Sequence, residues 1–118
     1  MKSTRSLLAS GIAIVAVLIL LSACSSSPTI TGTWKASDGS TTKIINDDGS
    51  CTGMYYNVGK VLDIGGPETC TLSSEEHNGY YDLIVRQPPN QETLQVSVQD
   101  STMTLHSNGT ELVILTKQ

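Results

Sequence analysis

The sequence predicts an all-β protein, folded as a small antiparallel up-and-down barrel of about eight strands. One observation is the recurrence of turn pairs after residue 32: Asp38-Gly39, Asp48-Gly49, Asn78-Gly79 and Asn108-Gly109. Such pairs permit the positive φ angles of tight hairpins. The other observation is that short β-branched or alternating stretches fill the intervals, without a helical period of useful length.

The turns delimit the predicted strands. In residues 94–99, Leu94, Val96 and Val98 alternate with polar residues, as in a strand with one buried face. Residues 112–115 are continuously apolar, which predicts a strand buried on both faces or closing the barrel. The predicted strands span residues 32–36, 41–46, 50–57, 68–73, 79–87, 92–99, 102–107 and 111–117, and a further short strand is allowed at 60–64.

Residues 58–67 form the least regular stretch, with three glycines and a proline around Val61, Leu62 and Ile64. If this stretch folds back on itself, Cys51 and Cys70 come to lie opposite each other at its base. Closure of the remaining strands into a barrel removes the exposed sheet edges. An eight-stranded barrel is filled by its own side chains or holds one small ligand, and we expect the filled form.

The first 23 residues differ in kind from the rest of the chain. Lys2 and Arg5 precede an uncharged apolar run over residues 7–21, which is the pattern of a secretory signal segment. The run is shorter than the ~20 residues of a membrane-spanning helix. We therefore expect a signal peptide at 1–23, a flexible serine-rich tether at 24–31 and the barrel domain at 32–118.

The signal segment ends in Leu21-Ser22-Ala23-Cys24, which resembles the lipobox of bacterial lipoproteins at each position. The resemblance implies that a diacylglycerol is attached to the Cys24 sulfur and that the chain is cut between Ala23 and Cys24. It further implies a domain held in the cell envelope, outside the cytoplasm, by acyl chains in a membrane. An ordinary signal peptide with a chance cysteine is the alternative.

The chain has three cysteines, an odd number. Lipidation of Cys24 leaves Cys51 and Cys70, and an exported pair tends to form a disulfide in an oxidising compartment. A metal-binding or catalytic thiol is the alternative, but neither cysteine has a CxxC partner or a nearby histidine. We therefore expect the disulfide.

The charge balance also restricts the partners. Lys2 and Arg5 precede the cleavage site, so the mature part has five basic against 11 acidic residues and a net charge of −6. A domain this acidic is poorly suited to nucleic acid or to an anionic membrane face. We expect no nucleic-acid partner, and the membrane is reached through the Cys24 lipid alone.

The predicted domain opens with Gly32-Thr33-Trp34, which resembles the Gly-x-Trp start of lipocalin-like small barrels. In that family the tryptophan closes one end of the barrel, so we expect Trp34 in the core. The resemblance carries an alternative function, the transport of a small apolar ligand inside the barrel.

No stretch carries the motif of a catalytic, metal or cofactor site. The run from Asn46 to Ser50 lacks calcium-loop spacing and predicts a hairpin turn. The run from Glu75 to His77 predicts a solvated turn, and His106 is expected to face solvent. The carboxylates of Asp63, Glu68 and Asp82 are scattered without visible partners, so we expect a non-enzymatic protein without a cofactor.

Two tyrosine pairs are the predicted binding residues: Tyr55 with Tyr56, and Tyr80 with Tyr81. Neighbours on a strand face opposite sides, so each pair should place one ring in the core and one outside. Exposed rings favour binding surfaces, although they could equally cover a sheet edge.

These features predict a module that binds another envelope protein or a glycan. The carrier is one alternative. The other is an inhibitor of a hydrolase such as lysozyme, with residues 58–67 or 87–91 as the inhibitory loop.

Overall fold

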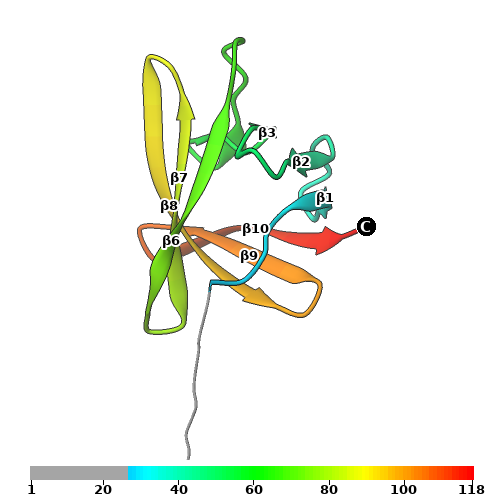
Figure 1. Ribbon diagram of the computed structural model, residues 1–118. Coiled ribbons are helices and arrows are strands. Elements are labelled where there is room, and N and C mark those ends of the chain that lie inside the picture. Colours follow the sequence, from blue (N-terminus) through cyan, green and yellow to red (C-terminus); the bar gives the residue numbers. More distant parts are fainter. Residues whose placement is uncertain (1–26) are drawn as a thin grey trace, which may run out of the picture.

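The computed structural model of the 118-residue chain describes residues 27–118. The predicted signal peptide and the predicted lipidation site at Cys24 lie outside the described residues. The described part is all-β, and eight of its ten strands form one antiparallel sheet that is nearly closed into a barrel (Figure 1). Among the described residues, no helix has the length and apolar character needed to cross a bilayer.

Ten strands are present in the described residues. They are β1 (Gly32–Ala36), β2 (Lys43–Ile45), β3 (Cys51–Thr52), β4 (Tyr56–Asn57), β5 (Lys60–Val61), β6 (Thr69–His77), β7 (Tyr80–Gln87), β8 (Asn90–Gln99), β9 (Thr102–Ser107) and β10 (Thr110–Lys117).

The large sheet has the order β3-β2-β1-β10-β9-β8-β7-β6. Strands β6 to β10 form a continuous meander, and β10 then pairs with β1, as an up-and-down barrel requires. The strands β3 and β6 are left as edges, and they approach each other across a seam. The Cys51 N–H donates to the Glu68 carbonyl at 2.9 Å, and the Cys70 N–H donates to the Gly49 carbonyl at 2.8 Å.

A disulfide between Cys51 and Cys70 crosses this seam, with the two Cα atoms 5.9 Å apart. The predicted bridge is therefore present, and it lies at the base of the segment between β3 and β6. Within that segment, β4 and β5 pair with each other as a separate two-stranded sheet. We refer to residues 53–67 as the inserted segment.

The barrel interior is lined by alternate residues of the strands, as the period-two pattern predicts. Trp34 is 1% exposed, and its Nε1 donates to the carbonyl of Ile30 at 2.9 Å. Ile30, which the sequence placed in the flexible tether, is instead buried within the core because this bond and its apolar side chain hold it there. The buried apolar residues are Ile30, Trp34, Ala36, Ile45, Cys51, Met54, Tyr56, Cys70, Leu83, Val85, Leu94, Val96, Met103, Leu105, Val113 and Leu115.

The predicted strand at 50–57 is broken after Thr52. Gly53 adopts φ +76°, and a side chain added there would come within 3.3 Å of Lys43 Cδ. Glycine allows this turn of the backbone over the lysine stem, and the chain leaves the large sheet at that point. The pairing resumes as the β4–β5 hairpin, which replaces the end of the predicted strand and the short strand allowed at 60–64.

Two other predictions need correction. The residues from Glu75 to His77 belong to β6 and not to a turn, because the β6–β7 turn needs only Asn78 and Gly79. Residues 112–115 are not buried on both faces: Ile114 is 37% exposed on the outside of the barrel. A register shift between Glu111 and Val113 lets Leu112 pack against the core, so three apolar residues of this run contact it.

Candidate functional site

The inserted segment is fixed to the barrel by three side chains of the large barrel and its seam: Glu68, Gln87 and Glu92. The Glu68 Oε2 accepts a hydrogen bond from the Met54 N–H at 2.8 Å. The Glu92 Oε1 accepts one from the Tyr56 N–H at 2.5 Å. Both acceptors are carboxyl oxygens, and bonds of this kind to backbone N–H groups are strong. The chain just before β4 and the start of β4 itself are therefore each bonded to the barrel.

Gln87 fixes the second half of the inserted segment. Its side chain is 2% exposed at the end of β7. The Gln87 Nε2 donates to Asp63 Oδ1 at 3.0 Å and to the Gly66 carbonyl at 3.3 Å, while its Oε1 accepts from the Ile64 N–H at 3.4 Å. A buried amide with partners for both of its ends orders the backbone that it contacts.

The pKa values of the buried Glu68 and the half-buried Glu92 are both shifted. Burial raises the pKa of Glu68, and the charge of Asp63 adds to this rise, although the Met54 N–H and Lys43 oppose it. Burial also raises the pKa of Glu92, against the opposing hydrogen bond from Tyr56, with Glu68 adding to the rise. The fold therefore disfavours the charged form of both groups relative to water.

A buried lysine lies inside the barrel, close enough to Asp38 and Glu68 for their charges to act on it. Lys43 is 0% exposed, its Nζ donates to Ser40 Oγ at 2.8 Å, and it lies 5.1 Å from the Tyr56 ring centroid. Burial lowers the pKa of Lys43, while Asp38 and Glu68 oppose this shift by their charge. The Tyr56 hydroxyl lies 3.3 Å from Asp38 Oδ2 in the β1–β2 turn. Tyr56 therefore contacts Lys43 through its ring and Asp38 through its hydroxyl.

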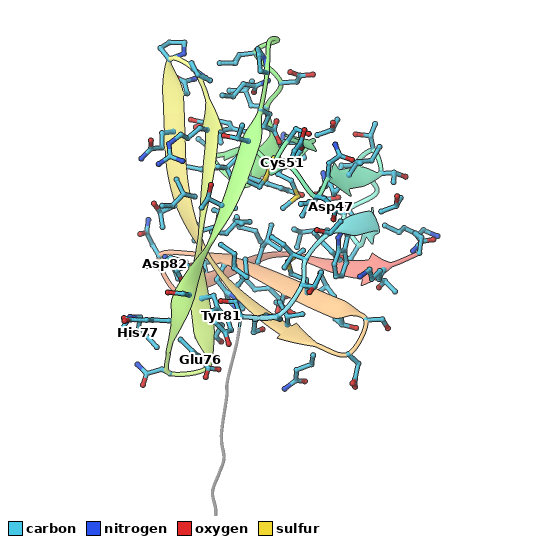
Figure 2. The ribbon with its side chains drawn as sticks, viewed as in Figure 1. Asp47, Cys51, Glu76, His77, Tyr81 and Asp82 are labelled. Carbon is cyan, nitrogen blue, oxygen red and sulfur yellow. A yellow bond between two sulfur atoms is a disulfide. The ribbon has the colours of Figure 1, made fainter. Side chains whose placement is uncertain are left out.

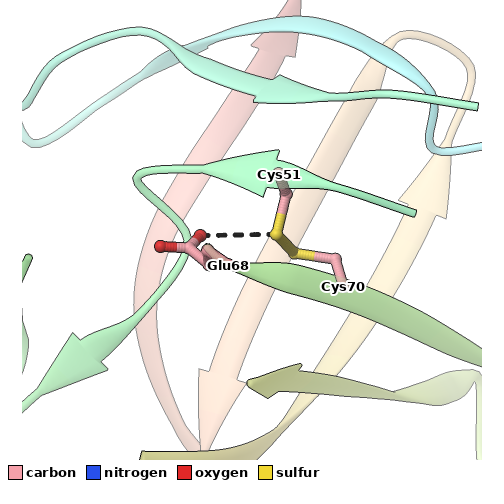
Figure 3. Close-up of side chains that lie close together, drawn as sticks. All are labelled: Cys51, Glu68 and Cys70. Atoms are coloured by element: carbon pink, nitrogen blue, oxygen red, sulfur yellow. Dashed lines mark hydrogen bonds between the residues drawn. A yellow bond between two sulfur atoms is a disulfide. The ribbon is translucent and has the colours of Figure 1, made fainter. Parts of the chain in front are cut away.

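The side chains of Cys51, Glu68 and Cys70 form the one group of potential metal ligands in the described residues (Figure 3). Their ligand atoms lie within 4.8 Å of one another, and Glu68 Oε2 is 3.3 Å from Cys51 Sγ. Cysteine binds a metal as a thiolate, and here the two sulfur atoms are bonded to each other. With both sulfur atoms in the disulfide, the Glu68 carboxylate is the one metal ligand left in this group. The group therefore has a structural role: it holds β3 and β6 together across the seam.

The tip of the β4–β5 hairpin is apolar and projects from the barrel. Val58 is 92% exposed and has φ +52°, whereas Leu62 and Ile64 behind it are 37% and 39% exposed. The Leu62 N–H donates to the Tyr55 carbonyl at 2.9 Å, which extends the hairpin pairing by one bond. A short, rigid element thus presents three apolar side chains to the surroundings.

The four predicted binding tyrosines lie in two separate places. Tyr56 is buried and Tyr55 packs partly against the core, both in the inserted segment. Tyr81 also packs partly against the core, and Tyr80 is 37% exposed, both at the start of β7 near the β6–β7 turn (Figure 2). Each pair has one more buried ring and one more exposed ring, and Tyr80 is the most exposed.

A surface pocket of about 300 Å³ lies beside Tyr80, lined by Tyr80, Gln95, His106 and Gly109. The Tyr80 ring meets the His106 ring edge-on, with centroids 5.0 Å apart and an interplanar angle of 78°. His106 therefore does not simply face solvent, as the sequence suggested: it is half-buried under the tyrosine because β8 brings the two outward-facing side chains together.

The remaining sequence candidates stay apart. Glu76 and His77 are exposed on β6, and Figure 2 shows them at the opposite end of the molecule from the β2–β3 turn that contains Asp47. That turn is the predicted hairpin: the Gly49 N–H donates to the Asn46 carbonyl at 3.0 Å. The two histidines do not form a common group with any carboxylate among the described residues.

Sequence reasoning missed Lys43, Gln87 and Glu92 and left Glu68 without a partner. No local signal marks these residues, because each contacts backbone or side chains of a different element. Glu92 and Tyr56, for example, are 36 residues apart in the sequence.

Comparison with protein families, with curated proteins and with solved structures yields no match.

Proposed function

We propose that this protein is a lipid-anchored, extracytoplasmic binding module that contacts an envelope protein through the tip of its β4–β5 hairpin. The anchor is the lipidated Cys24 implied by the lipobox resemblance. The disulfide between Cys51 and Cys70 is consistent with an oxidising compartment outside the cytoplasm. The protein acts in this proposal by binding, without catalysis.

The observation that carries the proposal is the backbone conformation of Val58. A left-handed conformation is costly for a β-branched residue and persists where the surrounding structure imposes it. The other non-glycine residues with positive φ in the described chain are Asn78, Asp100 and Asn108, which tolerate this conformation. Val58 is 92% exposed, so burial inside this protein does not offset its strain. Contact with a partner would bury the exposed Val58 side chain, which explains why the strained conformation is kept.

The hairpin is also suitably placed and rigid. The inserted segment that carries the hairpin has backbone N–H groups bonded to the side chains of Glu68, Gln87 and Glu92, so little conformational entropy remains to be lost on binding. In Figure 1 the green segment between β3 and β6 lies in the upper part of the view, whereas the described chain begins in the lower part. A hairpin remote from the anchored end can reach a partner away from the membrane.

The same geometry favours a second function, the inhibition of a hydrolase. A narrow, rigid, apolar hairpin is a suitable shape to enter an enzyme cleft, and it lies within the loop at 58–67 that the sequence suggested. The carrier alternative receives less support. Side chains exposed by 2% or less from six strands fill the barrel interior. The pockets near Tyr80 and near Ile114 are open surface pockets.

The experiment is site-specific photocrosslinking in the producing cells. A photoreactive benzoylphenylalanine replaces Leu62 in the full-length lipoprotein, next to the tip but outside the strained turn. It is combined with Val58→Asp, which removes the apolar tip, or with Ile114→Asp, which removes an exposed apolar residue of β10. Ile114 is 37% exposed, the same fraction as Leu62.

We expect one discrete protein adduct, lost with Val58→Asp and retained with Ile114→Asp. An adduct with a hydrolase, whose activity falls when the purified lipoprotein is added, would select the inhibitor function. The proposal is overturned if no adduct forms at Leu62, or if the adduct persists undiminished in the Val58→Asp variant.

A further inference from the structure

The pocket beside Tyr80 is independent of the hairpin and lies on the outer face of β7, β8 and β9. Gln95 and His106 are direct partners in the β8–β9 register, and Leu94 and Val96 on either side of Gln95 point into the core. The polar side chains thus face outward by strand alternation. The pocket volume of about 300 Å³ is at the lower end of the range for small-molecule sites.

The polar groups of this pocket have no partners within the described part of the chain. The side chains of Tyr80 and Gln95 form no hydrogen bond to another described residue. His106 Nδ1 is buried and has no hydrogen-bond partner there. A buried lone pair costs less than a buried N–H, so we assign the ring proton to Nε2. The site therefore combines a phenol, an amide and an imidazole donor beside an aromatic ring.

We propose that this pocket is a saccharide-binding site. A pyranose ring has one face of C–H groups and a rim of hydroxyl groups. The C–H face is suited to pack on the Tyr80 ring, while the rim is suited to the Gln95 amide and the His106 Nε2–H. Aromatic contact plus a few placed polar groups is the general composition of a small-ligand site. The backbone at Gly109 lies in the β9–β10 turn and leaves room at the rim of the pocket.

The surrounding charges favour a neutral sugar over an anionic one. No Lys or Arg lines the pocket, so an anionic ligand would lack a countercharge. Glu111 is the register partner of His106 on the other side of β9 and is exposed. Its carboxylate can accept a hydrogen bond from a hydroxyl group of a second sugar residue. An uncharged oligosaccharide is therefore the ligand class that this surface favours.

The test uses full-length lipoprotein in detergent micelles, titrated with the tetramer of N-acetylglucosamine, with cellotetraose and with mannotetraose. Binding is followed through the side-chain amide signals of Gln95 and the backbone amide signal of Gly109 in ¹H–¹⁵N spectra. The variants are Tyr80→Ala and Gln95→Ala, and Ile114→Ala is the matched control. Ile114 has the same exposed fraction as Tyr80, 37%, and lines a different surface pocket.

We expect at least one tetramer to shift the Gln95 and Gly109 signals in a saturable way. Tyr80→Ala and Gln95→Ala should each weaken that binding by at least about tenfold, as loss of ~1.4 kcal/mol would, and Ile114→Ala should leave it unchanged. Correctly dispersed spectra of the variants establish that they are folded. The inference is overturned if none of the three sugars shifts these signals, or if Tyr80→Ala binds as the wild type does.

Discussion

Cys51 and Cys70 are bonded to each other across the two edge strands of the sheet, β3 and β6. The bond lies at the one place where consecutive strands of the large sheet are not joined by a short turn. The inserted segment occupies that interval, so the disulfide at once completes the barrel and fixes the base of the hairpin. Beyond it, the seam has an isolated β-bridge between Ser50 and Thr69.

Removal of the disulfide should destabilise the domain and loosen the seam selectively. The bridge spans a sequence separation of 19 residues, for which the chain-entropy model gives about 3 kcal/mol. We expect the Cys51→Ala/Cys70→Ala variant to lose about that much free energy of unfolding in urea titrations. Hydrogen exchange should accelerate first at the Cys51 and Cys70 amides. Equal acceleration at Leu105, in the middle of β9, would contradict a seam-specific role.

Val58→Asn should stabilise the protein. Asparagine tolerates the positive φ that costs valine energy, and the exposed valine side chain has little burial to lose. We expect a gain of roughly 1 kcal/mol in the free energy of unfolding, within the range for backbone strain. Ile114→Asn, at an exposed strand position with ordinary φ, is the control and should not stabilise. A loss of stability in Val58→Asn would remove the strain argument.

Gln87→Ala should release the second half of the inserted segment. The substitution leaves the Ile64 N–H and the Gly66 carbonyl without their side-chain partner. The expected cost is about 1–3 kcal/mol for a buried hydrogen-bonding group. Exchange at Ile64 and Gly65 should accelerate, whereas Gln99→Ala, at an exposed position at the far end of β8, should change neither quantity. An unaltered exchange pattern would show that Gln87 does not order this segment.

Glu68→Gln should change the pH dependence of stability. Burial raises the pKa of Glu68 in the folded state, so the folded protein binds the proton more tightly than the unfolded chain. The contribution of this group is then most favourable below its unfolded pKa of 4.5 and is lost as the pH rises through the folded pKa. Glutamine keeps an oxygen for the Met54 N–H and carries no charge.

Urea midpoints measured at pH 4 and at pH 7 test this expectation. The variant should be more stable than the wild type at pH 7, and the difference should shrink towards pH 4. Asp48→Asn is a suitable comparison, because hydrogen bonds from Ser50 lower the pKa of Asp48 and its pH dependence has the opposite sign. A difference between Glu68→Gln and wild type that is independent of pH would contradict the burial of a titrating carboxyl group.

Cys24→Ser should abolish lipidation. Mass spectrometry of the native protein should show an N-terminal residue at Cys24 with a diacylglyceryl mass, and membrane fractionation should recover the wild type with the membranes. The Cys24→Ser variant should lack the lipid mass and leave the membrane fraction. A native product that begins at Met1, or lacks any lipid mass, would remove the basis for placing the domain in the envelope.

The chain on its own was enough to predict the all-β class, the hairpin turns at Asn78-Gly79 and Asn108-Gly109, and the pairing of Cys51 with Cys70. These features are local or follow from counting: a turn needs particular φ angles at two adjacent residues, and three cysteines with one assigned elsewhere leave one pair. The polar contacts of Glu68, Gln87 and Glu92 were decided by the tertiary structure, since their partners come from distant elements. The tertiary structure also decided the exposure of Val58 and the contact of Tyr80 with His106. Both depend on where the barrel closes and on which strands the closed barrel places side by side.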